Sequence, residues 1–395
     1  MIKPRKAFIA SAAAGLFALL TIISTLSIDR VFAAPTKSTP TATAAPTKAP
    51  ITAAITAAIT EQTQAAHRAA VLSYFSAIAP IAPGQRLTMG IELEGVFPGA
   101  SREMTFQKLG DLVETEFRKH IYTGATIQRT PYSFQTRRGE PRQAIKLTVS
   151  FAAPSKKVEE WHLRDDGSIR PPLDFYGVEL VTPILRKQSD VEKFRRLVAF
   201  LSAQGLRAQP DSAALQAHVG FTENGPIDKQ SITPASKVAE ALVMILTFSK
   251  IEKELMRLFA VNPARQKFTM PTPEPLVQAI LNGEISTADT KLFDVVEKYY
   301  EYRYWALNVH SLFQFGTVEV RFANSTVDPS TTDAFLDLSY KIVRAVRSKD
   351  PRLLALLNQH IDEEIPLIEL ARALDLKIIK SIYERECAQL LREPL

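Results

Sequence analysis

Three short stretches of the chain alternate apolar and polar residues, which is the pattern of a β-strand with one buried face. They are 90–94 (GIELE), 177–181 (GVELV) and 317–322 (TVEVRF). Because side chains alternate across a strand, Glu92 and Glu94 point to the same side, about 6.6–6.8 Å apart. We therefore predict three strands, each with a carboxylate opposite its apolar face.

Wider apolar spacing predicts the helices. A helical pattern begins near His67, and others cover residues 102–122, 190–204, 234–260 and 286–305. The segment 234–260 has a broad apolar stripe, so we expect it to pack on the back of the sheet.

Alternation and β-branched residues indicate one more hairpin. Residues 144–151 read as a strand that pairs with the segment 161–169. Residues 123–143 and 263–290 show no such pattern and are expected to be loops. Beyond Asp328 the pattern is helical to the end of the sequence.

The N-terminus predicts export. Lys3, Arg5 and Lys6 precede an uncharged apolar run over residues 7–26, and Val31-Phe32-Ala33 offers a small-residue cleavage site. We interpret residues 1–33 as a signal peptide or a signal anchor, and a retained anchor would contact the membrane through residues 7–26. In either case the positive-inside rule places the remaining chain outside the cytoplasm, secreted or anchored. A cytoplasmic protein with a buried first helix is the alternative.

Three segments follow this N-terminus. Residues 34–66 are rich in Ala, Thr and Pro, and we interpret them as a linker without a stable helix. Residues 67–345 form one large folded domain. Residues 346–395 form a helical C-terminal extension, with a break at Pro366.

Composition narrows the choice of function. The 395 residues are 46% hydrophobic, which suits a globular enzyme-sized domain. The formal charge of +6 falls to +3 without residues 1–33, which hold four basic residues and one acidic residue, so the sequence does not favour nucleic acid as a partner. A single cysteine, Cys387, excludes an intrachain disulfide and a cysteine zinc cluster. The oligomeric state is left open.

The acidic strands carry the candidate chemistry. If they share a sheet, their carboxylates meet on one face, and hard oxygen ligands suit Mg²⁺ or Mn²⁺. Glu319 and Arg321 share one strand face, and phosphoryl transfer requires such a pairing of metal ligand and fixed cation. The chain contains no GxxxxGK, GxGxxG, GxSxG or HExxH motif.

In order and spacing, five motifs of this chain resemble those of the amidoligases. The amidoligases are carboxylate-amine ligases of the glutamine synthetase and glutamate-cysteine ligase superfamily. The resemblance spans residues 86 to about 345. Its motifs are residues 90–94, Asp166-Gly167-Ser168 with 177–183, His218-Val219, Arg303 to Asn308, and residues 317–322. It implies an α+β fold with a curved, mainly antiparallel sheet, helices packed on one face, and ATP and divalent cations on the concave face.

The resemblance also implies roles for individual residues. The implied metal ligands are Glu92, Glu94, Glu179, His218 and Glu319. Cofactor contacts would come from Arg265, Arg321, His218 and Asn308. Arg303 and Arg321 would steady phosphate oxygens, and Asp166 would face the substrate amine. One position departs from the family pattern, because Gln216 stands where a histidine is usual.

These observations predict an ATP- and Mg²⁺-dependent ligase that joins a peptide or amino-acid-like carboxylate to an amine through an acyl phosphate. The implied partners are a substrate with a free carboxylate and an amine acceptor. The alternative is a catalytically inactive extracytoplasmic module that keeps the fold and binds ligand. Hydrolysis at an acid-lined metal site ranks last, because no general base is identifiable beyond the same carboxylates.

Overall fold

The computed structural model describes residues 49–81, 87–135, 139–152, 158–220, 225–300, 304–377 and 379. The predicted signal segment and Arg303 lie outside the described residues. No described helix combines the length and the apolar character that a membrane crossing requires. The chain divides into the units Met1–Ala57 and Ala58–Leu395, and the sheet and candidate site belong to the second.

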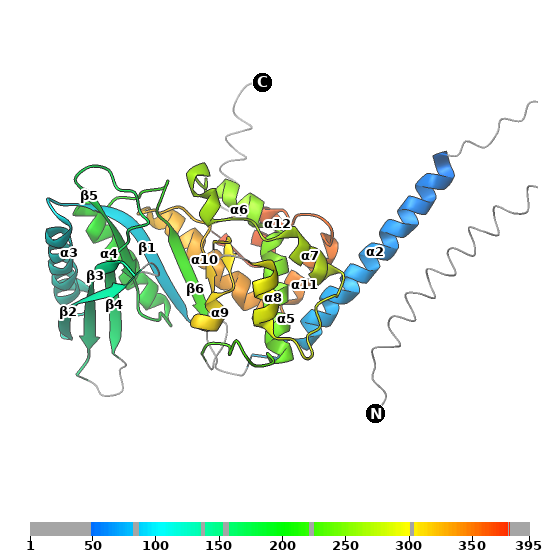
Figure 1. Ribbon diagram of the computed structural model, residues 1–395, viewed down its shortest axis with the longest axis horizontal. Helices are drawn as coiled ribbons and strands as arrows, with labels where there is room; N and C mark the ends of the chain where they lie inside the picture. The colour runs from blue at the N-terminus through cyan, green and yellow to red at the C-terminus, as the bar shows by residue number, and fades with distance from the viewer. Residues whose placement is uncertain are drawn as a thin grey trace, which may run out of the picture. The chain divides into compact units, whose positions relative to one another are not determined.

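The second unit contains an antiparallel sheet, whose strands are the arrows toward the left of Figure 1. Its eight strands among the described residues follow the order β2-β3-β4-β5-β1-β6-β8-β7, which is open at both edges. In chain order the strands are β1 (Met89–Pro98), β2 (Thr126–Gln135), β3 (Pro141–Ser150), β4 (Glu159–Asp165), β5 (Phe175–Val181), β6 (Leu215–Gly220), β7 (Leu307–Asn308) and β8 (Thr317–Val320).

Helices make up most of the remaining described chain. They are α2 (Ala49–Ala77), α3 (Arg102–Glu116), α4 (Gln188–Ala203), α5 (Ala235–Ser249), α6 (Glu252–Leu258), α7 (Glu274–Leu281), α8 (Leu292–Tyr299), α9 (Ser311–Gln314), α10 (Pro329–Arg347), α11 (Pro351–Gln359) and α12 (Leu367–Ala373). A π-helical turn, Phe117–Ile121, extends α3, and a 3₁₀ turn, Pro263–Phe268, precedes α7.

Local sequence explains several helix ends. Ser101 caps α3 by accepting a hydrogen bond from the Met104 amide at 3.2 Å. Asp328 caps α10 by accepting from the Thr331 amide at 2.7 Å, and proline occupies the first helical position. After the C-terminus of α4, Gly205 adopts a φ of 111°, a backbone conformation that residues with a side chain rarely adopt.

The apolar face of the sheet forms the core. Along β1, the buried side chains Met89, Ile91 and Leu93 point away from Glu92 and Glu94. Helix α3 packs against β2, β3 and β4, and α10 packs against β6. Helix α5 is buried almost throughout and packs against α10 and α7. Helices therefore cover the apolar face of the sheet, and Glu92 and Glu94 lie on the opposite face.

This architecture confirms the α+β prediction at the level of fold class. The three acidic stretches are strands β1, β5 and β8 of one sheet. The hairpin predicted from residues 144–151 is the β3–β4 pair. The helices predicted at 102–122 and 190–204 are present as α3 with its π-helical turn and as α4.

Other boundaries differ from the prediction. The expectation that residues 34–66 lack a stable helix is wrong from Ala49 onward, because α2 begins there. Alanine is the best helix former, and the C-terminal part of α2 is anchored by the buried Val71, Tyr74 and Phe75. Tertiary packing of the C-terminal end of α2 thus stabilises a helix that would not be stable from the helix propensity of its residues alone.

Two expected loops contain regular structure. The segment 123–143 includes β2, which pairs with β3 over ten residue pairs. The segment 263–290 includes the 3₁₀ turn and α7. The helix expected over 234–260 is two helices, α5 and α6, and the one expected over 286–305 is only α8. Helix α12 begins after Pro366, where the break was predicted.

Ile91 tests the role of the buried β1 face. It is fully buried, so Ile91→Ala should lower the free energy of unfolding by about 2–5 kcal/mol through lost contacts and a residual cavity. The matched control is Ile232→Ala, since Ile232 is 58% exposed and should change stability by less than about 0.5 kcal/mol. Urea unfolding measures both, and equal values would contradict this account of the core.

Candidate active site

Strand register brings the polar side chains of the acidic strands to one face of the sheet. Glu94 on β1 lies directly opposite Glu179 on β5. His218 on β6 lies opposite Glu319 on β8. Asn308 on β7 lies opposite Glu319 from the other side. Five neighbouring strands therefore share one polar face, which we call the acidic face.

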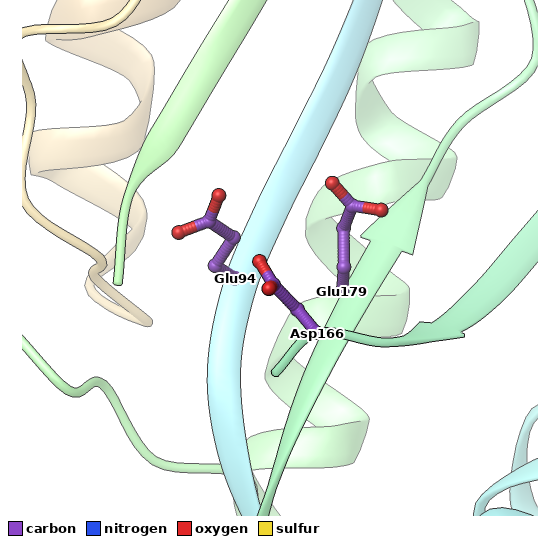
Figure 2. A group of neighbouring side chains, drawn as sticks. All are labelled: Glu94, Asp166 and Glu179. Atoms are coloured by element: carbon purple, nitrogen blue, oxygen red, sulfur yellow. The ribbon is translucent and has the colours of Figure 1, made fainter. Parts of the chain in front are cut away.

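Three carboxylates gather at the centre of this face. Glu94, Asp166 and Glu179 have oxygens that all lie within 4.8 Å of one another (Figure 2). Asp166 comes from the turn after β4 and accepts a hydrogen bond from the Ser168 amide at 2.7 Å. We call these three residues the carboxylate cluster. Sequence reasoning named all three, but it assigned Asp166 to the substrate amine instead of to the acids.

Hydrogen bonds hold Glu94 in place. Its Oε1 accepts from the Gln216 side-chain amide at 2.6 Å, and its Oε2 accepts from the Ala214 backbone amide at 2.7 Å. The side chain is 8% exposed. Gln216 therefore acts as a donor that orients a carboxylate, which explains why an amide is compatible with this position.

Glu92 lies on the same face but pairs with His218. The His218 Nε2 is 3.4 Å from Glu92 Oε1, and its Nδ1 is 3.3 Å from the Thr317 hydroxyl. The Nδ1 nitrogen therefore has a hydrogen-bond partner, whereas the buried Nε2 has only this ionic contact with Glu92. The predicted metal ligands Glu92 and His218 form an ion pair beside the cluster.

Glu319 is also held by neighbours. Arg321 donates from Nη1 to Glu319 Oε1 at 2.9 Å, and Asn308 donates its side-chain amide to Oε2. The Nε of Arg321 is buried and makes no hydrogen bond to any described residue. Arg321 thus has one buried donor that the described residues leave unused.

Arg265 is placed differently from its predicted role. It is 2% exposed, and its Nη1 donates to the Ala323 carbonyl at 2.6 Å. Its Nη2 lies 3.5 Å from the Arg321 carbonyl. The guanidinium therefore supports the segment that follows β8, and a nucleotide would reach it only after rearrangement.

Arg164 is a site residue that sequence reasoning missed. Its Nη1 lies 3.5 Å from Glu179 Oε2, and β4 places it directly opposite Glu179. The alternation of Trp161, His162, Leu163 and Arg164 on a predicted strand was the available signal.

The electrostatics divide the acidic face into two regions. Burial and the nearby Asp166 carboxylate raise the pKa of Glu94 to about 8, although Arg321 and Arg265 oppose the shift. Burial, followed by the charge of Glu92, also raises the pKa of Glu179. In metal-free protein, Glu94 therefore retains its proton near neutral pH.

The ion pair beside the cluster behaves in the opposite way. Burial works against ionisation of Glu92, but the hydrogen bond and charge of His218, with Arg164, lower its pKa to about 2. Burial likewise disfavours protonated His218, yet Glu92 and Glu319 outweigh it and raise the pKa of His218. Both shifts favour the charged form of the pair.

The donor set of the carboxylate cluster fits a hard divalent cation. Oxygens that share one Mg²⁺ or Ca²⁺ at about 2.0–2.6 Å lie at most about 4–5 Å apart. The 4.8 Å limit on the cluster oxygens is consistent with that span. A cation would also displace the protons that burial and mutual repulsion keep on the cluster.

The sequence that forms this site matches a known protein family. A family model described as "Putative amidoligase enzyme" matches residues 85–343, a span that includes every predicted site residue. The chain belongs to the amidoligase family. No curated protein matches this amidoligase-family chain.

The titration of Glu94 predicts a pH dependence of stability in metal-free protein. Its carboxyl pKa rises from 4.5 to about 8 on folding, so its contribution is present below pH 4.5 and is lost as the pH rises to about 8. Glu94→Gln should show a smaller fall in Tm between pH 5 and pH 8 than the parent chain. Exposed Glu103→Gln is the control, and an unchanged pH slope in Glu94→Gln would contradict the shift.

Calorimetry tests the cluster as a metal site. Glu179→Gln and Asp166→Asn each remove an anionic ligand, so each should weaken Mg²⁺ binding by more than about tenfold. Glu103→Gln should bind Mg²⁺ as the parent does. Parental affinity in both cluster variants would exclude the cluster as the metal site.

Proposed function

We propose that this amidoligase-family chain is an ATP- and Mg²⁺-dependent ligase that joins a carboxylate to an amine. The observation that carries the proposal is the juxtaposition of the carboxylate cluster with the Glu319–Arg321 pair on one sheet face. A metal-binding acid set beside a fixed guanidinium suits phosphoryl transfer better than hydrolysis. The family match supports amide-bond formation as the overall reaction.

The proposed metal ligands are Glu94, Asp166 and Glu179. Bound Mg²⁺ would neutralise phosphate charge and so favour transfer of the γ-phosphoryl group. Gln216 would keep the Glu94 carboxylate oriented when its proton is displaced. The charged Glu92–His218 pair would hold the neighbouring part of the face in a fixed electrostatic state.

In the first proposed step, a substrate carboxylate oxygen attacks the γ-phosphorus of ATP, the bond to the β-phosphate oxygen breaks, and ADP leaves. Arg321 would donate its free Nε–H to a phosphate oxygen and stabilise the charge that develops there. Glu319 fixes the guanidinium for this task through its 2.9 Å hydrogen bond.

In the second step, the amine nitrogen attacks the acyl carbon, the bond to the phosphate oxygen breaks, and inorganic phosphate leaves. The amine loses one proton as the amide forms. Asp166 has two carboxylate oxygens, so one would bind the metal and the other would orient the amine and accept its proton. The substrate class is a peptide or an amino-acid-like carboxylate with an amine acceptor.

Mass spectrometry of protein incubated with Mg·ATP and a pool of amino acids and short peptides tests this function. We expect products that have lost one water and ADP formation that requires an amine. Glu94→Gln and Arg321→Ala should each lower turnover by about 10²-fold or more, because each removes charge stabilisation of the transferred group.

Two controls separate chemistry from folding. Arg321→Lys keeps the charge and should retain more activity than Arg321→Ala. Arg352 is an exposed residue of α11, and Arg352→Ala should leave turnover unchanged. Binding of Mg·ATP without any product would instead support the inactive binding module. Parental turnover in Glu94→Gln and Arg321→Ala would refute the assigned site.

A further inference from the structure

A groove with a volume of about 480 Å³ lies between α4 and α10, on the side of the sheet that the helices cover. Met89 lines it, and Met89 points away from the acidic face that carries Glu92. The groove shares no residue with the carboxylate cluster.

Two helix faces form the walls. Gln188, Val191 and Arg195 follow a helical spacing along α4, and residues 333–341 of α10 supply the opposite wall. At a rise of about 1.5 Å per residue, the wall formed by α4 is about 10 Å long and the wall formed by α10 is about 12 Å long. Arg195 donates to Asp333 across the groove, which shows that the two helices lie side by side.

The floor is apolar. Leu87, Met89, Leu185 and Leu336 are each between 3% and 7% exposed. Backbone hydrogen bonds between Met89 and Leu185, at 3.0 and 2.7 Å, fix two of these residues at the start of β1. The floor is therefore built on the rigid part of the molecule.

The charges of the lining are unequal. Asp333 is neutralised by Arg195, and Asp337 by Lys341 at 3.1 Å. Arg186, Lys187 and Lys377 form no side-chain hydrogen bond or ion pair with the described residues, and Asp375 is the one other acid among the residues that line the groove. Asp190, outside the lining, accepts hydrogen bonds from the backbone amides of Arg186 and Lys187. Two of the three free cations, Arg186 and Lys187, are neighbours at the start of α4.

We propose that this groove binds a small organic anion with an apolar body, such as a medium-chain carboxylate. The apolar floor would bury the hydrocarbon, and the excess of unpaired cations would hold the anionic group. The volume lies in the range of small-molecule sites. The proposal is independent of the ligase reaction, because it uses none of the residues assigned to that reaction.

Three eight-carbon probes that differ only in their polar group test the proposal. Calorimetry should show that octanoate binds at least about tenfold more tightly than octanol and that octylammonium does not bind, because only the carboxylate complements the free cations. Arg186→Glu and Lys187→Glu should each weaken octanoate binding several-fold and leave octanol binding unchanged. Both positions are exposed, so these variants should fold normally.

A control and a mapping experiment complete the test. Lys119→Glu, at an exposed lysine of the π-helical turn, should bind octanoate as the parent does. A diazirine derivative of octanoate should label peptides that contain residues 185–195 or 333–341. Equal affinity for octanoate and octylammonium, unchanged binding in Arg186→Glu and Lys187→Glu, labelling confined to other peptides, or no binding at all would overturn the proposal.

Discussion

The antiparallel pairing of β1 with β5 sets Glu94 directly opposite Glu179, and the rest of the site depends on this contact between like charges. Carboxylates that face each other across a strand pair repel, and burial makes their ionisation still more costly. The protein meets this cost with donors around Glu94, with the guanidinium of Arg164 near Glu179, and with retained protons. A divalent cation would replace those protons and relieve the repulsion.

Burial of the apolar side of the same strands offsets the cost of placing these carboxylates close together. Ile91 and Leu93 alternate with the acids of β1 and are buried in a core shared with helices α3, α4, α5 and α10. Their burial stabilises the sheet, and the sheet then holds the acids in register whatever their mutual repulsion. Stability and chemistry thus come from opposite faces of one strand.

The acidic face is not uniform, and its division has a functional meaning. Glu92 with His218, and Glu319 with Arg321, are ion pairs that are satisfied within the protein. Glu94, Asp166 and Glu179 are acids without matching cations of their own, apart from the distant approach of Arg164 to Glu179. The unmatched group suits a metal, and the unused Nε of Arg321 suits a phosphate oxygen. The groove between α4 and α10 lies on the other side of the sheet, so the site that we propose there shares no residue with the carboxylate cluster.

Period-two alternation by itself determined β1, β5 and β8 and the face on which Glu92, Glu94, Glu179 and Glu319 lie, because alternation is a local property of an extended chain. The resemblance of the motifs to the amidoligases then determined the family. Only the tertiary structure decided which acids meet, since the partner of Glu94 depends on strand order and register, and Asp166 reaches the cluster from a turn. It also decided that Gln216 donates to Glu94, that Arg265 is buried, and that α2 extends back to Ala49, because each depends on contacts between residues far apart in the chain.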